Sequence, residues 1–175
     1  MAIATPELLE AGLNEIRRAP ADAGTVELIA ARPAEDERAV LDAGVLDAEA
    51  GLVGDSWGSR PKVDPAAQLT LMNARVAALV AGARDRWALA GDQLYVDLDL
   101  SIENLPAGTR LAVGDAVVQI SELPHTGCAK FSARFGSDAL RFVNSAEGRA
   151  RRLRGVNARV VSGGAVHVGD AVRKL

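Results

Sequence analysis

Short apolar runs separated by glycine–aspartate pairs are the feature that most limits the folds open to this chain. The run VGDAV occurs at residues 113–117 and again at residues 168–172, and further Gly-Asp pairs lie at residues 54–55 and 91–92. Such pairs mark tight turns, because glycine accepts a positive φ angle and aspartate hydrogen-bonds its own backbone. No βαβ alternation is visible between the runs. The pattern predicts a mainly β fold with some helix, namely a closed or nearly closed β-barrel decorated by short helices.

Local patterns place the elements along the chain. The apolar spacing over residues 5–18 predicts an amphipathic helix capped by Thr5. Residues 68–72 are typical of a strand followed by a helix from an Asn73 cap to Gly82, although one continuous helix from residue 64 also fits the spacing. Further helices are expected from residues 136–138 and from Ser145 to Gly155. Strands are expected at residues 25–30, 94–100, 110–121, 158–161 and 166–172, a helix or loop at residues 38–46, and a loop at residues 51–61.

Composition restricts the class of protein. With 175 residues, of which 49% are hydrophobic and 25% charged, the chain can bury the core of one domain. The 23 acidic and 20 basic residues nearly balance, which argues against a nucleic-acid partner. No run approaches the roughly 18 apolar residues of a membrane span, and the start lacks the features of a signal peptide. We expect a cytoplasmic protein with no membrane partner, with a helical extension over residues 1–23 and a single β-barrel domain over residues 24–175.

The segment at residues 123–131 holds the only cysteine, Cys128, and one of the two histidines. Lys130 and Arg134 follow closely, and neighbouring cations favour the reactive thiolate form of a cysteine. A proline and a glycine predict a turn leading up to Cys128, and loops are where a scaffold presents chemistry. The alternative is a buried cysteine that packs as a small hydrophobe. A lone cysteine excludes an intrachain disulfide and a Cys-rich zinc site.

Two other groups of polar residues have open interpretations. His125 can orient a ligand, donate a proton or favour the thiolate of Cys128, or it can simply hydrogen-bond the backbone of a turn. The arginines that crowd residues 149–154 are interpreted as a solvated helix face, with contact to an anion or a cofactor phosphate as the alternative.

Several segments in register resemble the MOSC domain, the module found at the C-terminus of molybdenum-cofactor sulfurases. They are residues 51–55 (GLVGD), residues 104–108, residues 124–131 (PHTGCAKF), residues 134–136 (RFG) and residues 159–170. The similarity covers roughly residues 24–175, and the segment around Cys128 is its most specific part. The resemblance implies a strongly twisted MOSC or pyruvate-kinase-barrel-like β-barrel in which a loop cysteine faces a cleft.

The resemblance also implies a cofactor. In MOSC proteins that bind the molybdenum cofactor (molybdopterin), the cysteine matching Cys128 ligates the metal, while basic and backbone groups hold the pterin dithiolene and phosphate. Thiolate suits a soft metal–sulfur centre, and arginine suits a phosphate. We therefore expect Cys128 as metal ligand and, together with His125, as a catalytic residue. The expected cofactor-binding residues are Arg60, Asn104, Thr126, Gly127, Lys130 and Arg134, with a solvated charge as the alternative for Lys130 and a backbone contact as the alternative for Asn104.

Three functions follow as hypotheses. Related enzymes reduce N-hydroxylated substrates such as amidoximes and hydroxylaminopurines, and this oxidoreductase activity predicts a flavin or iron–sulfur redox partner. A second role proposed for the family is that of a sulfur carrier, with a persulfide on Cys128 supplied by a partner such as a cysteine desulfurase. The 175 residues contain neither a ferredoxin module nor the pyridoxal-phosphate domain of the sulfurases, nor the extra N-terminal β-barrel that usually precedes the MOSC domain in amidoxime reductases. The third hypothesis is a Cys–His hydrolase or acyl transferase, for which the sequence identifies no orienting acid.

Overall fold

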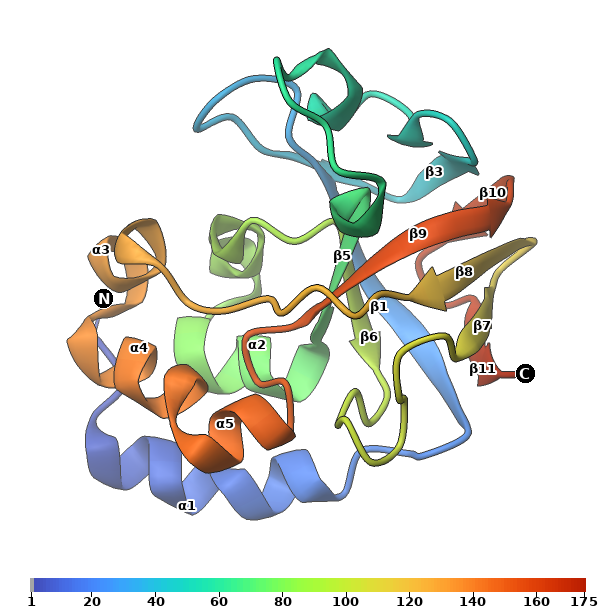
Figure 1. Cartoon of the computed structure of the whole chain (residues 1–175). Helices are drawn as coiled ribbons and strands as arrows, with labels where there is room; N and C mark the ends of the chain where they lie inside the picture. Colours follow the sequence, from blue (N-terminus) through green and yellow to red (C-terminus); the bar gives the residue numbers. More distant parts are fainter. Residues whose placement is uncertain (1) are drawn as a thin grey trace.

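The strands close into a barrel, with the helices gathered along one side of it (Figure 1). The computed structural model describes residues 2–175. Around the barrel each strand pairs with the next, and the pairing of the first strand with the last closes the ring of seven. In order around the ring the strands are β1 (Ala23–Ala31), β11 (Ala171–Lys174), β7 (Arg110–Val113), β8 (Ala116–Ile120), β9 (Val156–Ser162), β5 (Leu69–Asn73) and β6 (Leu94–Asp97). The predicted β-barrel is thus confirmed.

One neighbouring pair in the ring is parallel. Strands β5 and β6 run in the same direction, and the chain between them forms the helix α2 (Ala74–Ala81) and the 3₁₀ helix η3 (Arg84–Ala90). This makes a single βαβ unit within an otherwise antiparallel barrel. The sequence does not reveal it, because one such unit produces no alternating pattern.

Residues 38–46 form strands, so the expectation of a helix or loop there is wrong. Strand β2 (Ala39–Leu41) pairs with β1 outside the ring, and β3 (Ala43–Asp47) is the central strand of a small second sheet. That sheet also contains β10 (Gly164–His167) and β4 (Gly51–Leu52), the latter within the segment expected to be a loop. These strands contain two to five residues each, too few for a clear two-residue period, and β3 also takes a distant partner in β10, so local propensity does not identify them.

Successive side chains along the barrel strands point to opposite faces of the sheet and so belong to two separate apolar layers. In β6, Leu94 and Val96 belong to the cluster inside the barrel, whereas Tyr95 between them belongs to the cluster beneath the helices. This is the two-residue period of a strand that is covered on both faces. The helices of the outer layer are α1 (Pro6–Arg17), α2, α3 (Ala129–Phe135), α4 (Ser137–Asn144) and α5 (Ala146–Ala150), and two further 3₁₀ turns are η1 (Trp57–Ser59) and η2 (Pro65–Ala67).

Helices α1 and α2 begin directly after the capping residues that the sequence predicts. Thr5 accepts a hydrogen bond from the Leu8 N–H at the start of α1, and Asn73 accepts from the first N–H groups of α2. The Asn73 cap confirms the strand followed by a helix and excludes the single helix from residue 64. Within residues 2–175, no helix combines the length and the apolar character needed to cross a membrane.

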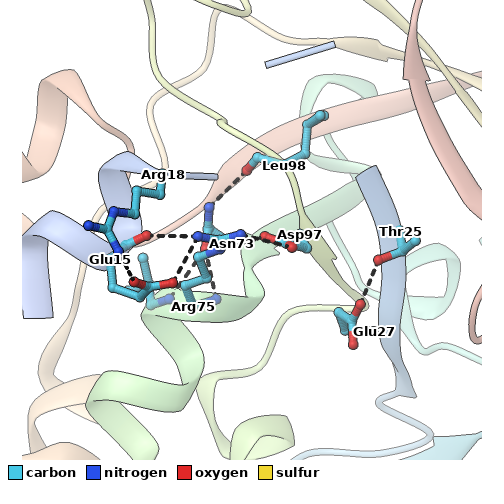
Figure 2. A network of polar contacts seen from close by, with 9 residues as sticks. Glu15, Arg18, Thr25, Glu27, Asn73, Arg75, Asp97 and Leu98 are labelled. Carbon is cyan, nitrogen blue, oxygen red and sulfur yellow. Dashed lines mark hydrogen bonds and ion pairs between the residues drawn. The ribbon is translucent and has the colours of Figure 1, made fainter. Parts of the chain in front are cut away.

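A polar network ties α1 and α2 to the barrel (Figure 2). Arg75 at the start of α2 donates from Nε to Asp97 Oδ1 of β6 (2.8 Å) and from Nη1 to Glu15 Oε1 of α1 (3.1 Å). Asn73 donates from Nδ2 to the Leu98 carbonyl oxygen (2.8 Å). Asn73 thus caps α2, and Asn73 and Arg75 together fix the position of the helix on the sheet.

Elements after residue 128 agree only in part with expectation. Helix α4 confirms the helix expected from residues 136–138, while α5 ends at Ala150 instead of Gly155. Helix α3 is not expected from the sequence, because its seven residues are too few for a clear apolar period. The strand expected at residues 166–172 is divided into β10 and β11 around Gly169, whose φ is +92°.

Candidate functional site

Cys128 lies exposed at the residue that precedes helix α3. The segment from residue 121 to residue 128 contains no regular element, as expected for a presenting loop. Within α3, Phe131 and Phe135 are buried and contact each other with ring centroids 5.0 Å apart. The two aromatic rings hold α3 on the helical layer, so the thiol is presented by a fixed helix end.

Gly127 is held by a double hydrogen bond to Asn144 of α4. The Gly127 N–H donates to Asn144 Oδ1 (2.8 Å), and Asn144 Nδ2 donates to the Gly127 carbonyl oxygen (3.1 Å). A Cβ at Gly127 would lie 2.7 Å from Leu140 Cδ1, so a larger residue there would require the Leu140 side chain to move. The N–H of Gly127 is therefore already used, which leaves no free donor there for the anion contact expected from the sequence.

The pKa of the Cys128 thiol is lowered from its ordinary value. The largest cause is the backbone N–H of Phe131, which stabilises the thiolate. Burial, the next largest effect, raises the pKa of the thiol. The N–H of Lys130 and the charges of Arg154 and Arg134 lower this pKa further. The thiol thus combines exposure with a bias toward its nucleophilic and metal-binding form.

Cys128 faces a cleft of about 750 Å³ whose lining is strongly cationic. Five of the residues expected at the site meet here: Arg60, His125, Cys128, Lys130 and Arg134. Thr126 lines a separate, smaller cavity of about 290 Å³, where His125 also contributes to the lining. The cationic side chains of the larger cleft are Arg32, Arg38, Arg60, Lys130, Arg134 and Arg154, and its acidic ones are Glu35 and Asp36.

Asn104 lies outside this cleft. Its Nδ2 donates to the carbonyl oxygens of Ala21 (2.8 Å) and Asp99 (2.7 Å), and its Oδ1 accepts from Lys174 Nζ (2.8 Å). Every polar atom of the side chain is thus engaged in joining loops. The cofactor-binding role expected for Asn104 is not compatible with this position, and the alternative of a backbone contact describes it.

A buried carboxylate, Asp92, connects His125 to Arg154. His125 Nε2 lies 3.1 Å from Asp92 Oδ1, and Arg154 Nη1 lies 2.6 Å from Asp92 Oδ2. Burial alone would raise the pKa of Asp92, but the charge of Arg154 and the contacts with His125 outweigh it and lower the pKa to about 2. Asp92 is therefore ionised throughout the physiological range.

The ionised state of Asp92 fixes the tautomer of His125. An ionised carboxylate only accepts hydrogen bonds, so the Nε2 of His125 must carry the proton that joins it to Asp92 Oδ1. The other ring nitrogen, Nδ1, is then the one that Asp92 does not hold. The structure thus supplies His125 with the orienting acid that the sequence does not reveal, although no hydrogen bond joins His125 to Cys128 among the described residues.

Arg154 corrects the interpretation of residues 149–154 as a solvated helix face. Helix α5 ends at Ala150, and a turn with Arg152 at a φ of +50° directs the chain inward. Arg154 is consequently only 6% exposed, and its guanidinium lies 5.1 Å from the centroid of the Phe131 ring. Arg149, exposed on α5, and Arg151, which makes an ion pair with Glu147, follow the expected pattern.

Arg32 and Arg38 are site residues that the sequence analysis missed. Arg32 makes a two-pronged contact with the buried carboxylate of Asp55, Nε to Oδ1 at 3.0 Å and Nη2 to Oδ2 at 2.9 Å. Arg38 donates from Nε to the Ala88 carbonyl oxygen and has no carboxylate at ion-pair distance among residues 2–175. The pKa of Arg38 is lowered, first by burial and then by the positive charges of Arg134 and Arg32. The cleft therefore holds like charges close together, an arrangement that an anion would relieve.

The donor set limits how a metal can be bound. Within the described residues, no three His, Cys, Asp or Glu side chains come together in a cluster able to hold a metal ion. Cys128 is the only soft donor on the wall of the cleft. The cleft therefore fits a metal that brings its other ligands with it and takes one thiolate from the protein.

Fold and site together define a β-barrel protein with a cysteine at the edge of a cationic cleft. The sequence model of the MOSC domain family matches residues 65–173, and the chain belongs to that family. MOSC domains are associated with the molybdenum cofactor. The match contains Cys128, His125, Asp92 and Arg154, whereas Arg32, Arg38 and Arg60 precede it.

Three bacterial proteins of known structure share the fold of this chain. The YuaD protein from Bacillus subtilis superposes with a TM-score of 0.65 at 16% sequence identity, over 86% of this chain and 94% of that one. YiiM from Escherichia coli gives a TM-score of 0.58 at 18% identity, over 86% and 69% of the two chains. YiiM from Geobacillus stearothermophilus gives 0.55 at 14% identity, over 87% and 73%. Identities this low show a shared fold, and a comparison with curated proteins finds no match.

Proposed function

We propose that the cleft binds a molybdenum cofactor and that Cys128 is the protein ligand of the metal. The observation that carries the proposal is an exposed thiol with a lowered pKa on the wall of a cleft of about 750 Å³ lined by six cationic side chains. Membership of the MOSC family supports the same assignment.

The residues present fit such a cofactor. A single thiolate suits a metal whose remaining ligands are dithiolene sulfurs supplied by the pterin. Arg38 and Arg60, which have no carboxylate at ion-pair distance among the described residues, are the side chains suited to hold the phosphate end.

When bound, the cofactor supplies two-electron redox chemistry, and we propose N-hydroxylated compounds as the substrates. Removing the hydroxyl oxygen as water consumes two electrons and two protons, so a separate flavin or iron–sulfur protein must supply the electrons. In this chain, His125 lines the cleft and is held at Nε2 by Asp92, which leaves Nδ1 as the ring nitrogen able to pass a proton to the substrate. Asp92 and Arg154 keep the imidazole ring oriented, so that proton release does not depend on rotation of the ring.

A second candidate function rests on the lowered pKa of the exposed thiol. As a sulfur carrier, the Cys128 thiolate would attack the terminal sulfur of a donor persulfide. A new S–S bond forms on Cys128, the S–S bond of the donor breaks, and the donor leaves as a thiolate. A cysteine desulfurase is the class of partner that presents such a persulfide.

Metal and pterin analysis of protein purified from a host that makes molybdenum cofactor tests the first proposal. We expect near-stoichiometric molybdenum in the wild type and its loss in Cys128→Ala, with unchanged urea unfolding because the thiol is exposed. Molybdenum absent from both proteins would overturn the proposal, and a cyanide-labile sulfur on Cys128 would then support the sulfur carrier. Equal molybdenum in both proteins would exclude Cys128 as the ligand.

A further inference from the structure

The four cations of the cleft that have carboxylate partners fall into two groups. Arg32 and Arg154 are paired with Asp55 and Asp92, whose side chains are completely buried. Lys130 and Arg134, which follow Cys128 on helix α3, are paired instead with acids of the exposed segment at residues 33–37, here called the acidic strap.

The contacts of the acidic strap are specific. Lys130 Nζ lies 2.9 Å from Glu35 Oε1 and 3.7 Å from Asp36 Oδ1, and Arg134 Nη2 lies 3.0 Å from Asp36 Oδ1. The Glu35 and Asp36 side chains are nevertheless 82% and 67% exposed. Asp36 also has a φ of +60°, a conformation that aspartate and asparagine tolerate better than most residues.

The difference in burial decides which of these ion pairs can exchange their carboxylate for another anion. Removing one partner from a buried pair leaves an uncompensated charge, whereas an exposed pair contributes little and is screened by salt. Arg32 and Arg154 are therefore fixed, while Lys130 and Arg134 can leave the strap for another anion. Both sets of cations line the same cleft as Cys128.

We infer that Glu35 and Asp36 occupy the cations beside Cys128 in place of an anionic ligand, and that such a ligand enters the cleft by displacing them. The ligand class is a small molecule that presents carboxylate or phosphate oxygens. The inference rests on the proposed function only in taking Cys128 as the group that the ligand must reach. Displacement of Glu35 and Asp36 leaves Lys130 and Arg134 facing the ligand with no carboxylate of the strap to neutralise them.

The lone cysteine allows a direct test. Iodoacetate and iodoacetamide both alkylate the Cys128 thiolate, but only iodoacetate is an anion, so the ratio of their rate constants cancels any change in the pKa of the thiol. In the double variant Glu35→Gln, Asp36→Asn we expect this ratio to rise about threefold or more over the wild type at low salt. Both replacements keep size and hydrogen-bonding capacity, and asparagine also suits the backbone of residue 36.

Glu37→Gln is the matched control. Glu37 belongs to the same strap, but its side chain makes no ion pair among the described contacts, whereas its carbonyl oxygen accepts from Arg38 Nη1. An unchanged ratio in the double variant, or an equal rise in Glu37→Gln, would overturn the inference. As a second measurement, inorganic phosphate should slow the reaction of Cys128 with iodoacetamide at a lower concentration in the double variant than in the wild type. No experiment here uses a cofactor, so failure of the strap inference leaves the cofactor proposal standing, and failure of molybdenum binding leaves this result unaffected.

Discussion

Asp92 accepts from His125 through one carboxylate oxygen and from Arg154 through the other, although its side chain is completely out of contact with water. Charges are tolerated in such a place only when they are paired and hydrogen-bonded. The network therefore does two things at once: it neutralises Arg154 beneath the cleft, and it fixes which nitrogen of His125 can exchange a proton.

Replacing Asp92 by asparagine should remove about 3–5 kcal/mol from the free energy of unfolding at neutral pH, because Arg154 is left buried without a counter-charge. The folded-state pKa of Asp92, about 2, lies below its ordinary value, so its ionisation stabilises the fold above about pH 4. That contribution, about 2 kcal/mol, is lost as the pH falls from 4 toward 2. Urea unfolding from pH 6 to pH 3 should show the difference between the wild type and Asp92→Asn narrowing below about pH 4. A difference that stays constant to pH 3 would contradict this account.

At the scale of residues, sequence identifies the groups that lie near Cys128 in the chain and misses those that reach it from elsewhere. His125, Lys130 and Arg134 are evident because they are close neighbours of the thiol. Asp92 is read as a turn residue, since its partners His125 and Arg154 lie 33 and 62 positions away. No local pattern records such a contact.

At the scale of elements, the junction between the turn after α5 and strand β9 governs the site. Gly155 has a φ of +114°, and a Cβ there would lie 2.5 Å from the Leu71 carbonyl oxygen of β5 and 3.2 Å from both Asp92 Oδ1 and His125 Cδ2. The glycine thus brings β9 against β5 while leaving space for the pair that orients the histidine.

Gly155→Ala should therefore be more damaging than an alanine at a glycine with the same backbone preference but open surroundings. Gly169 is that control, with a φ of +92° and no atom within 4 Å of its Cβ position. We expect Gly169→Ala to cost about 1–2 kcal/mol of unfolding free energy through backbone strain. Gly155→Ala should cost a further 1–3 kcal/mol because backbone must move. Equal losses for the two variants in urea unfolding would argue against the close packing.

Helices that begin at a side-chain cap can be predicted from the sequence, whereas short strands that depend on their pairing with other strands cannot. Helices α1 and α2 begin at Thr5 and Asn73 because a side-chain cap is encoded beside the first turn. Strands β2 and β3 contain only three and five residues; β2 pairs with β1, and β3 pairs with β4 and with the distant β10. Their identity therefore depends on a fold that local sequence does not describe.

At the scale of the whole molecule, the barrel and the helical layer share their strands. Leu28 and Tyr95 pack beneath the helices, while Ile29 and Leu94, their neighbours in the chain, fill the barrel. Neither layer can be exposed without opening the same sheet. We infer that they unfold together.

Leu13→Ala in α1 tests this coupling. Leu13 is 4% exposed and belongs to the cluster beneath the helices, so its truncation should cost about 2–5 kcal/mol. The loss should appear in one cooperative transition seen equally by tryptophan fluorescence and by far-UV circular dichroism. Leu8→Ala in the same helix is the control, because Leu8 is 53% exposed and should change stability by less than about 0.5 kcal/mol. Two separate transitions in Leu13→Ala would show that the layers unfold independently.

The closed barrel can be predicted from the spacing of turns, whereas the order of its strands cannot. Gly-Asp turns and short apolar runs limit the chain to a curved sheet. The parallel contact of β5 with β6 and the contact of β1 with β11 join segments whose sequences contain no sign of one another. Seeing which edges meet requires the folded structure.

The contact of β1 with β11 has a consequence for how the protein is made. β1 contains residue 23 and β11 ends at residue 174, so the ring has a gap until nearly the whole of this chain has left the ribosome. During synthesis the nascent sheet carries an unpaired edge on β1, of the kind that recruits strands from other chains. The emerging polypeptide would therefore benefit from a chaperone that covers that edge until residues 171–174 arrive.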